Sequence, residues 1–242
     1  MLKIVTFNTW GAYGPAERQP VLLEAIQELD ADILCLQEVT DTSLFENLRY
    51  PACLHAPVSW LAILSRLPVL RYRHELYKTV SPLEGTPRGI LLAEIQAGPS
   101  SFWIATTHLA WKAEDEPSRT AQTKELLDLV APFRDRVLLS GDFNAPAGER
   151  PVREILQAGF SDLYSQFHPL DPGITWDNRN PFIQSHSVRF PDRRIDYLFL
   201  HKNAAGLLPP TRCEVVCRAP AANGLHPSDH YGVMAYFDKT FR

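Results

Sequence analysis

The sequence lacks the features that mark several protein classes. Only 4 of its 242 residues are cysteine, too few for a fold held together by disulfides. No segment approaches the ~18 consecutive apolar residues that a membrane-spanning helix needs. Basic residues are not in excess, because 24 Lys and Arg stand against 28 Asp and Glu. A broad basic face for nucleic acid is therefore not expected, and any phosphate should be bound at a focused site that includes a metal.

The remaining composition and the cysteines indicate a folded protein in a reducing compartment. Hydrophobic residues make up 45% and charged residues 21%, values that exclude a disordered chain. Cys35 lies in an apolar run and is expected to be buried, while Cys213 and Cys217 have no second pair with which to bind zinc. Residues 1–7 show no export signal. We expect free thiols, a cytoplasmic location and a monomer.

Apolar runs and amphipathic segments alternate along the chain. Three segments fit helices: 21–29, 118–130 and 152–158. Nine runs fit strands: 2–7, 32–36, 60–64, 89–96, 102–107, 136–139, 195–201, 212–217 and 232–237. The strands cluster in the middle and at the end, which favours a mixed α/β or α+β arrangement with much antiparallel pairing. No linker or repeat divides the chain, so we expect a single domain over residues 1–242.

Polar side chains recur at the point where predicted strands end. Asn8 follows the first strand, Glu38 the second, His108 the fifth and Asp142 the sixth. Each of these residues has an ordinary explanation when taken alone, as a turn residue or a solvated acid. Strand ends are also where rigid elements hold catalytic groups beside loops that admit substrate. The repetition of the pattern favours a functional site.

The segment that contains Asp142 and Asn144 has two possible conformations. The two side chains project from one face if the chain there is extended, and an Asx turn is the equal alternative.

Two further residues need a partner that is distant in the sequence. Asp196 lies among apolar strand residues, where a carboxylate needs a partner that Arg194 or a histidine could supply. His230 follows an acid, but adjacent side chains usually point apart, so a distant carboxylate orients it better.

Six short segments together resemble the endonuclease/exonuclease/phosphatase superfamily, which has the deoxyribonuclease-I-like fold. They appear in the family's order between residues 6 and 230: Thr6-Phe7-Asn8, Leu36-Gln37-Glu38, Thr107-His108, Gly141-Asp142-Phe143-Asn144, Arg194-Ile195-Asp196-Tyr197 and Ser228-Asp229-His230. The resemblance implies an α+β fold with four α/β/β/α layers, in which two mostly antiparallel sheets pack together and helices flank them. It also implies hydrolysis of phosphate esters.

The resemblance further implies a Mg²⁺ or Mn²⁺ cofactor. Asn8, Glu38 and Asp229 could supply its ligands, together with water molecules. Their carboxylate and amide oxygens are ligands that a hard divalent cation prefers. The bound metal would neutralise charge on the phosphoryl and leaving oxygens.

Catalytic roles follow from the same resemblance. Asp196 would hold His230, and this pair would take the proton of the attacking water or stabilise the charge of the phosphate. Asp142 is the competing candidate for positioning or deprotonating that water. Asn144 and His108 would bind the substrate by donating hydrogen bonds to its non-bridging oxygens. No covalent enzyme intermediate is expected.

The segments 174–181 and 190–196 bear on the substrate. They resemble the corresponding region of tyrosyl-DNA phosphodiesterases and neutral sphingomyelinases. Trp176 could stack on a base or pack under its loop. Arg194 belongs to the densest basic cluster, which also includes Arg179, Arg189 and Arg193. These arginines could clamp a substrate phosphate or pair with nearby acids. Trp10 and Trp111 are further candidates for the pocket rim.

Three functions remain open at this point. The leading one is a phosphodiesterase of the nuclease or DNA-end-processing type, acting on nucleic acid ends or single strands. The second is a phosphodiesterase or phosphatase for a lipid head group or an inositol phosphate. A non-catalytic binding module is disfavoured, because matching residue types fill all of the expected polar positions.

Overall fold

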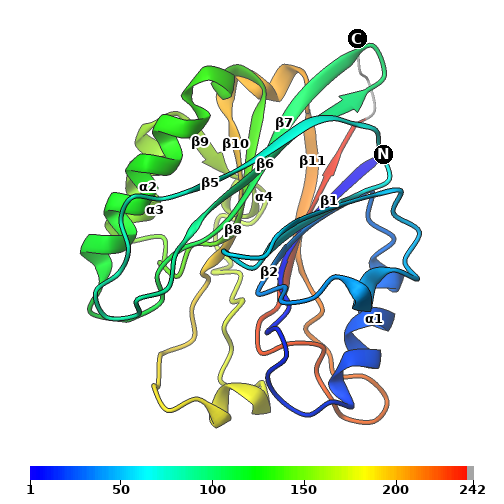
Figure 1. Ribbon diagram of the computed structural model, residues 1–242, viewed down its shortest axis with the longest axis vertical. Coiled ribbons are helices and arrows are strands. Elements are labelled where there is room, and N and C mark those ends of the chain that lie inside the picture. The colour runs from blue at the N-terminus through cyan, green and yellow to red at the C-terminus, as the bar shows by residue number, and fades with distance from the viewer. Residues whose placement is uncertain (239–242) are drawn as a thin grey trace.

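Two six-stranded β-sheets lie face to face in the computed structural model, which describes residues 1–238 (Figure 1). The strands of sheet A, in spatial order, are β11 (Pro210–Val216), β12 (Gly232–Phe237), β1 (Leu2–Asn8), β2 (Ile33–Gln37), β4 (Leu61–Ser65) and β3 (Ala52–Ala56). Those of sheet B are β5 (Val69–Leu76), β6 (Gly89–Ala97), β7 (Ser100–His108), β8 (Val137–Asp142), β10 (Asp196–His201) and β9 (Phe160–Asp162).

Antiparallel pairing dominates both sheets, as expected. The exceptions are one parallel pair in each sheet, β1 with β2 and β7 with β8. Parallel neighbours end at the same edge of a sheet. Each parallel pair therefore brings two strand ends together, and these ends carry the polar residues singled out above.

Side chains along the strands point alternately into the core between the sheets and into the core between one sheet and its helices. In β10, Leu198 and Leu200 face the other sheet and join the cluster between the sheets. Tyr197 and Phe199 face the opposite way and pack in the cluster that the helices cover. Burying both faces of the strand in this way is the physical basis of the four-layer architecture.

Helices cover the outer face of each sheet (Figure 1). α1 (Arg18–Leu29) packs Leu22 and Ile26 against sheet A. α2 (Glu116–Val130) and α3 (Arg150–Gln157) pack against sheet B, and Asp115 caps α2 by accepting a hydrogen bond from the Ser118 amide. The predicted helix–sheet–sheet–helix fold class is confirmed.

The nine predicted strands and three predicted helices are all present, with ends shifted by up to three residues. Three strands were not predicted. β5 is an edge strand whose mostly exposed or half-buried residues give no apolar pattern, and β3 and β9 are short edge strands. The additional short helices are α4 (Leu163–Phe167), η1 (Ser43–Phe45), η2 (Ala131–Arg136), η3 (Pro181–Ser185) and η4 (Lys202–Gly206).

The structure also bears on the membrane and disulfide expectations. Across residues 1–238, none of the helices combines the length and the apolar character needed to cross a membrane. All four cysteines carry free thiols, and Cys35 and Cys213 are buried.

A buried ion pair ties the start of β10 to its neighbours. The guanidinium of Arg194 contacts both carboxylate oxygens of Asp162, with Nη1–Oδ1 at 2.8 Å and Nη2–Oδ2 at 2.6 Å. Its Nε donates to the carbonyl of Pro172. Asp162 also accepts from the backbone amides that open α4. The bidentate pair therefore joins β9, α4 and the segment that leads into β10.

Arg194→Met should lower the free energy of unfolding by about 3–5 kcal/mol, because it leaves the Asp162 carboxylate buried and uncompensated. Urea denaturation measures this loss. Arg212→Met is the matched control, since the ion pair of Arg212 with Glu214 is largely exposed and its removal should cost less than about 1 kcal/mol. If the two substitutions lower the stability equally, the buried Arg194–Asp162 pair does not stabilise the fold more than an exposed pair does.

Candidate active site

The strand register brings the polar strand ends of sheet B to one level. His108, at the end of β7, is the register partner of Asp142, at the end of the parallel strand β8. Asp196, at the start of the antiparallel strand β10, lies directly opposite Asp142. In sheet A, Asn8 ends β1 beside Gln37 of β2. Residues far apart in the sequence are thereby gathered at one end of the sandwich.

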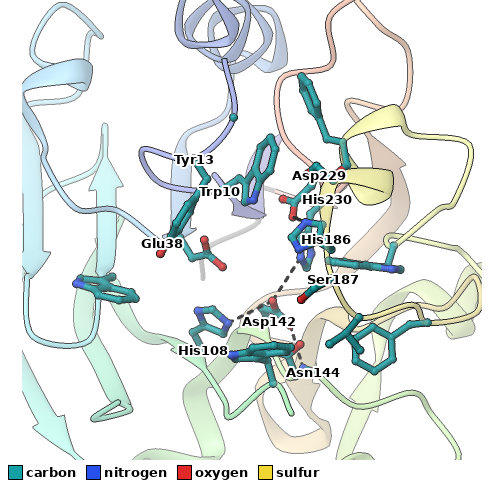
Figure 2. Close-up of a pocket in the computed structure, with 18 of the residues that line it drawn as sticks. Trp10, Tyr13, Glu38, His108, Asp142, Asn144, His186, Ser187, Asp229 and His230 are labelled. Carbon is teal, nitrogen blue, oxygen red and sulfur yellow. Dashed lines mark hydrogen bonds and ion pairs between the residues drawn. The ribbon is translucent and has the colours of Figure 1, made fainter. Parts of the chain in front are cut away.

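Glu38 reaches the site through a strained backbone. Its φ is 59°, which is uncommon for a residue other than glycine. The backbone on both sides is pinned, because the Thr9 amide donates to the carbonyl of Gln37 and the Val39 amide donates to the carbonyl of Trp60. These bonds hold Glu38 with its carboxylate toward the cavity (Figure 2).

The carboxylate of Asp142 lies at the centre of the site (Figure 2). Its Oδ2 accepts a hydrogen bond from Asn8 Nδ2 at 3.0 Å and lies 3.5 Å from His108 Nε2 and 3.7 Å from His230 Nε2. Its Oδ1 accepts from the backbone amide of Asn144 at 2.9 Å. With φ of 49° at Asn144, the segment forms the Asx turn and is not extended.

Asp196 supplies the distant carboxylate that orients His230. Its Oδ2 lies 2.9 Å from His230 Nδ1, so the other ring nitrogen, Nε2, is left to face Asp142. The partner of Asp196 is therefore the histidine, and not Arg194. Trp176 packs edge-on against the imidazole of His230, with ring centroids 5.1 Å apart, and fixes its other face.

Burial and charge shift the pKa values of these groups in different directions. Burial alone would lower the pKa of His230, but the negative charges of Asp196, Asp142 and Asp229 outweigh it and raise the pKa to about 10. Burial, reinforced by the charge of Asp196, raises the pKa of Asp142 to about 7. Burial and the charges of nearby cations hold the pKa of His108 well below its usual value. At neutral pH His230 is therefore protonated and His108 is neutral.

A second group of carboxylates lies beside this cluster. Glu38 accepts a hydrogen bond from Asn8 Nδ2, and burial together with the charge of Asp229 raises the pKa of its carboxyl. Asp229 Oδ2 lies 2.9 Å from His186 Nε2, a contact that no sequence motif indicated. Asn180, the residue before η3, donates to the carbonyls of Ser228 and Asp229 and so links η3 to the loop that carries Asp229.

Two sets of side chains could hold a metal. Asp142, Asp196 and His230 offer ligand atoms within 4.8 Å of one another. Hydrogen bonding already accounts for this proximity, because Asp196 and His230 bond to each other. Glu38 and Asp229 are acidic, face the same cavity and repel each other electrostatically, and Asn8 adds an amide. An oxygen-rich donor set with unbalanced negative charge suits a hard divalent cation.

A cavity of about 620 Å³ opens over these groups. Four of the five tryptophans line it: Trp10, Trp60, Trp111 and Trp176. Trp176 is only 6% exposed and packs with Ile183 and Ile195, so it both supports its loop and borders the cavity. The predicted rim positions of Trp10 and Trp111 are confirmed, while Trp60 was not predicted.

The arginine prediction needs a correction. Arg194 lies outside the cavity lining and is bound to Asp162, so it is not available to a substrate. Its neighbour Arg193 lines the cavity instead, as does Arg88. Arg179 pairs with Asp177, as the alternative interpretation held. Arg88 immediately precedes a strand, a position that could have drawn attention to it.

The chain is similar to known proteins over most of its length. The model of the Endonuclease/Exonuclease/phosphatase family matches residues 5–230. The uncharacterized protein YbhP of Escherichia coli K12 is 27% identical over 265 residues, which cover 94% of this chain and 92% of YbhP. D. rerio TDP2, solved in complex with a single-strand DNA product, has a TM-score of 0.81 at 20% identity and 98% coverage of both chains. Beta toxin from Staphylococcus aureus has a TM-score of 0.79 at 20% identity, covering 98% of this chain and 100% of the other.

Gly141→Ala tests the strand register that aligns His108 with Asp142. Gly141 has a φ of +143°, and a Cβ there would lie 2.1 Å from the carbonyl oxygen of Thr107. Alanine must therefore push β7 and β8 apart, and we expect a loss of more than about 2 kcal/mol in urea denaturation. A Cβ added at Gly148 would have no atom within 4 Å, so Gly148→Ala should change stability by less than about 1 kcal/mol. A neutral Gly141→Ala would disprove the close packing.

Proposed function

The chain belongs to the endonuclease/exonuclease/phosphatase family, and from that membership we propose that it is a divalent-metal-dependent phosphodiesterase acting on nucleic acid ends or single strands. The observation that carries the proposal is the His230–Asp196 pair, held opposite Asp142 at the floor of a cavity that also contains two acidic oxygen donors. This combination provides a proton donor, a proton acceptor and a cation site around one point.

Glu38, Asp229 and Asn8 would hold the metal, Mg²⁺ or Mn²⁺. The fit rests on their oxygen atoms and on the negative charge that Glu38 and Asp229 bring to the cavity. The bound cation would neutralise charge on the phosphoryl and leaving oxygens. His186 and Ser228 both contact the carboxylate of Asp229 and so restrict its orientation.

The residues of the chain would then divide the proton chemistry. Water forms a bond to phosphorus while the bond to the leaving oxygen breaks, which yields a phosphomonoester and an alcohol. Three carboxylates surround His230 and favour its protonated form, so Nε2 would donate to a phosphoryl oxygen. Asp142, across from it, would orient the water and accept its proton. Asn144 and His108 would donate to the non-bridging oxygens.

The lining of the cavity favours nucleic acid over a choline-type head group. Trp60 and Trp111, both half-buried, offer aromatic faces on which bases can stack. Arg193, which also lines the cavity, attracts phosphate and would repel a quaternary ammonium group. D. rerio TDP2, which shares the fold, was solved with a single-strand DNA product. A focused cavity without an extended basic face is better suited to the ends of nucleic acids and to single strands than to long duplexes.

Hydrolysis of a bis-aryl phosphate diester should require Mg²⁺ or Mn²⁺ and stop on addition of EDTA. His230→Ala should lower kcat by about 10²–10⁴-fold, because it removes the proton donor from the reaction centre. Initial rates of phenolate release measure both effects.

His168→Ala is the matched control, because His168 bonds to the carbonyl of Cys213 and does not line the cavity. Its kcat should stay within about threefold of the unsubstituted protein if the loss is specific to His230. A panel of oligonucleotides, sphingomyelin and inositol phosphates then tests the substrate class. If no diester or monoester is hydrolysed with any divalent metal, the proposal fails.

Mn²⁺ binding measured by electron paramagnetic resonance separates the two metal positions without any turnover. Glu38→Gln should weaken the binding by at least about tenfold, because it removes a charged ligand. Asp196→Asn should change it by less than about threefold, since Asp196 holds His230 and not the metal. The opposite result would move the metal to the cluster of Asp142, Asp196 and His230.

A further inference from the structure

Two arginines flank the reaction centre along the end of sheet B. Arg88 directly precedes β6, His108 ends β7, Asp142 ends β8, and Arg193 lies shortly before β10. These four strands are adjacent in the order β6-β7-β8-β10. Neighbouring strands are about 4.8 Å apart, so the two arginines stand on opposite sides of His108 and Asp142. Both line the cavity.

The two arginines differ in their partners. Arg88 Nη2 is paired with Glu84 at 2.9 Å, and both side chains are buried, so an anion of the protein already balances its charge. Within residues 1–238, the guanidinium of Arg193 has no hydrogen bond or ion pair, and its Nε is buried without any partner. Arg193 is therefore the cation of this cavity whose charge no direct partner balances.

Packing holds the guanidinium of Arg193 in place. Its central carbon lies 3.6 Å from the ring centroid of Phe190 and 5.8 Å from that of Trp176. The Arg193 backbone bonds in both directions with the backbone of Trp176, which fixes the base of the side chain. A guanidinium stacked on aromatic rings keeps its N–H edge free for an anion.

Nearby groups do not satisfy these donors. The acids whose charge acts most strongly on Arg193 are Asp142, Glu149 and Asp196, and each of them already binds another residue of the chain. Burial lowers the pKa of Arg193 to about 10, which still leaves it charged at neutral pH. The indole Nε1 of Trp176 is also buried without a partner. Unsatisfied buried donors are costly, and a bound anion would remove that cost.

We propose that Arg193, together with Trp176 Nε1, forms a subsite for a second phosphate group of the substrate, separate from the phosphate that is cleaved. The inference rests on the proposed phosphodiesterase function and narrows its substrate class. The preferred substrates are phosphodiesters that carry another phosphate one sugar away, as in a nucleic acid chain. Diesters whose remainder is neutral or cationic lack this contact.

The test compares p-nitrophenyl esters of thymidine monophosphates with and without a phosphate on the other hydroxyl, in both the 3′ and 5′ orientations. Each pair shares its scissile bond and leaving group. At least one phosphorylated ester should have a kcat/KM about 10–100-fold above its partner, mainly through KM. Arg193→Gln should bring this ratio close to one, and Arg193→Lys should keep part of it. Arg212→Gln, with the same charge change outside the cavity, should keep the full ratio.

Calorimetric binding of thymidine 3′,5′-bisphosphate and of the two monophosphates, in EDTA, supplies a readout without turnover. The bisphosphate should bind more tightly, and Arg193→Gln should remove the difference. If diesters are hydrolysed but the ratio is near one, or survives Arg193→Gln, the second-phosphate subsite is wrong and the proposed function stands. If no diester is hydrolysed, the proposed function fails, and the binding comparison alone decides whether Arg193 selects a second phosphate.

Discussion

Burial of the Asp142 carboxylate is the constraint on which the site depends. The side chain is 1% exposed, and a carboxylate at such a position needs hydrogen-bond donors. They come from both sheets, because Asn8 belongs to β1 of sheet A while the Asn144 amide follows β8 of sheet B. The two sheets must therefore meet at this end with their strand ends level. Moving either sheet by one residue would leave Asp142 without half of its donors.

A polar contact between the sheets supports this arrangement just below the site. Gln37, fully buried in β2, donates through its amide nitrogen to Thr6 of its own sheet and to Thr106 of sheet B, at 3.1 and 2.8 Å. Apolar side chains fill most of the interface between the sheets, and apolar packing alone tolerates small sliding movements. Hydrogen bonds with fixed geometry do not tolerate such movements. Gln37 therefore sets the relative height of the two sheets next to the candidate site.

The sequence predicted the features that local patterns encode. Apolar runs identified nine of the twelve strands that lie within residues 1–238, and the repeated strand-end polar residues identified Asn8, Glu38, His108 and Asp142 as candidates for one site. The family resemblance supplied the pairing of Asp196 with His230, but contacts between distant residues that no motif marks were not predicted. The choice between Arg193 and Arg194 depends on Asp162, which lies 32 positions away in the sequence, and His186 reaches Asp229 from a loop without any motif. The positive φ of Glu38 depends on bonds made by its neighbours and has no signal in its own residue type.

Charge distribution explains how a chain with net charge −4 could bind the anionic substrate that we propose. Four acids converge on the site, and the fixed cations around them are themselves constrained. Arg18 is fully buried, and its guanidinium donates only to backbone carbonyls, among them those of Thr9 and Pro227, so it acts on Asp229 and Glu38 through its field and not by contact. Arg88 is paired with Glu84. Negative charge therefore remains on the side of the cavity near Glu38, where it would attract a divalent cation. The guanidinium of Arg193, which has no acidic partner, leaves the opposite side of the cavity positive. This polarity across one cavity would align a phosphodiester chain, with the cleaved phosphate at the metal and the next phosphate at Arg193.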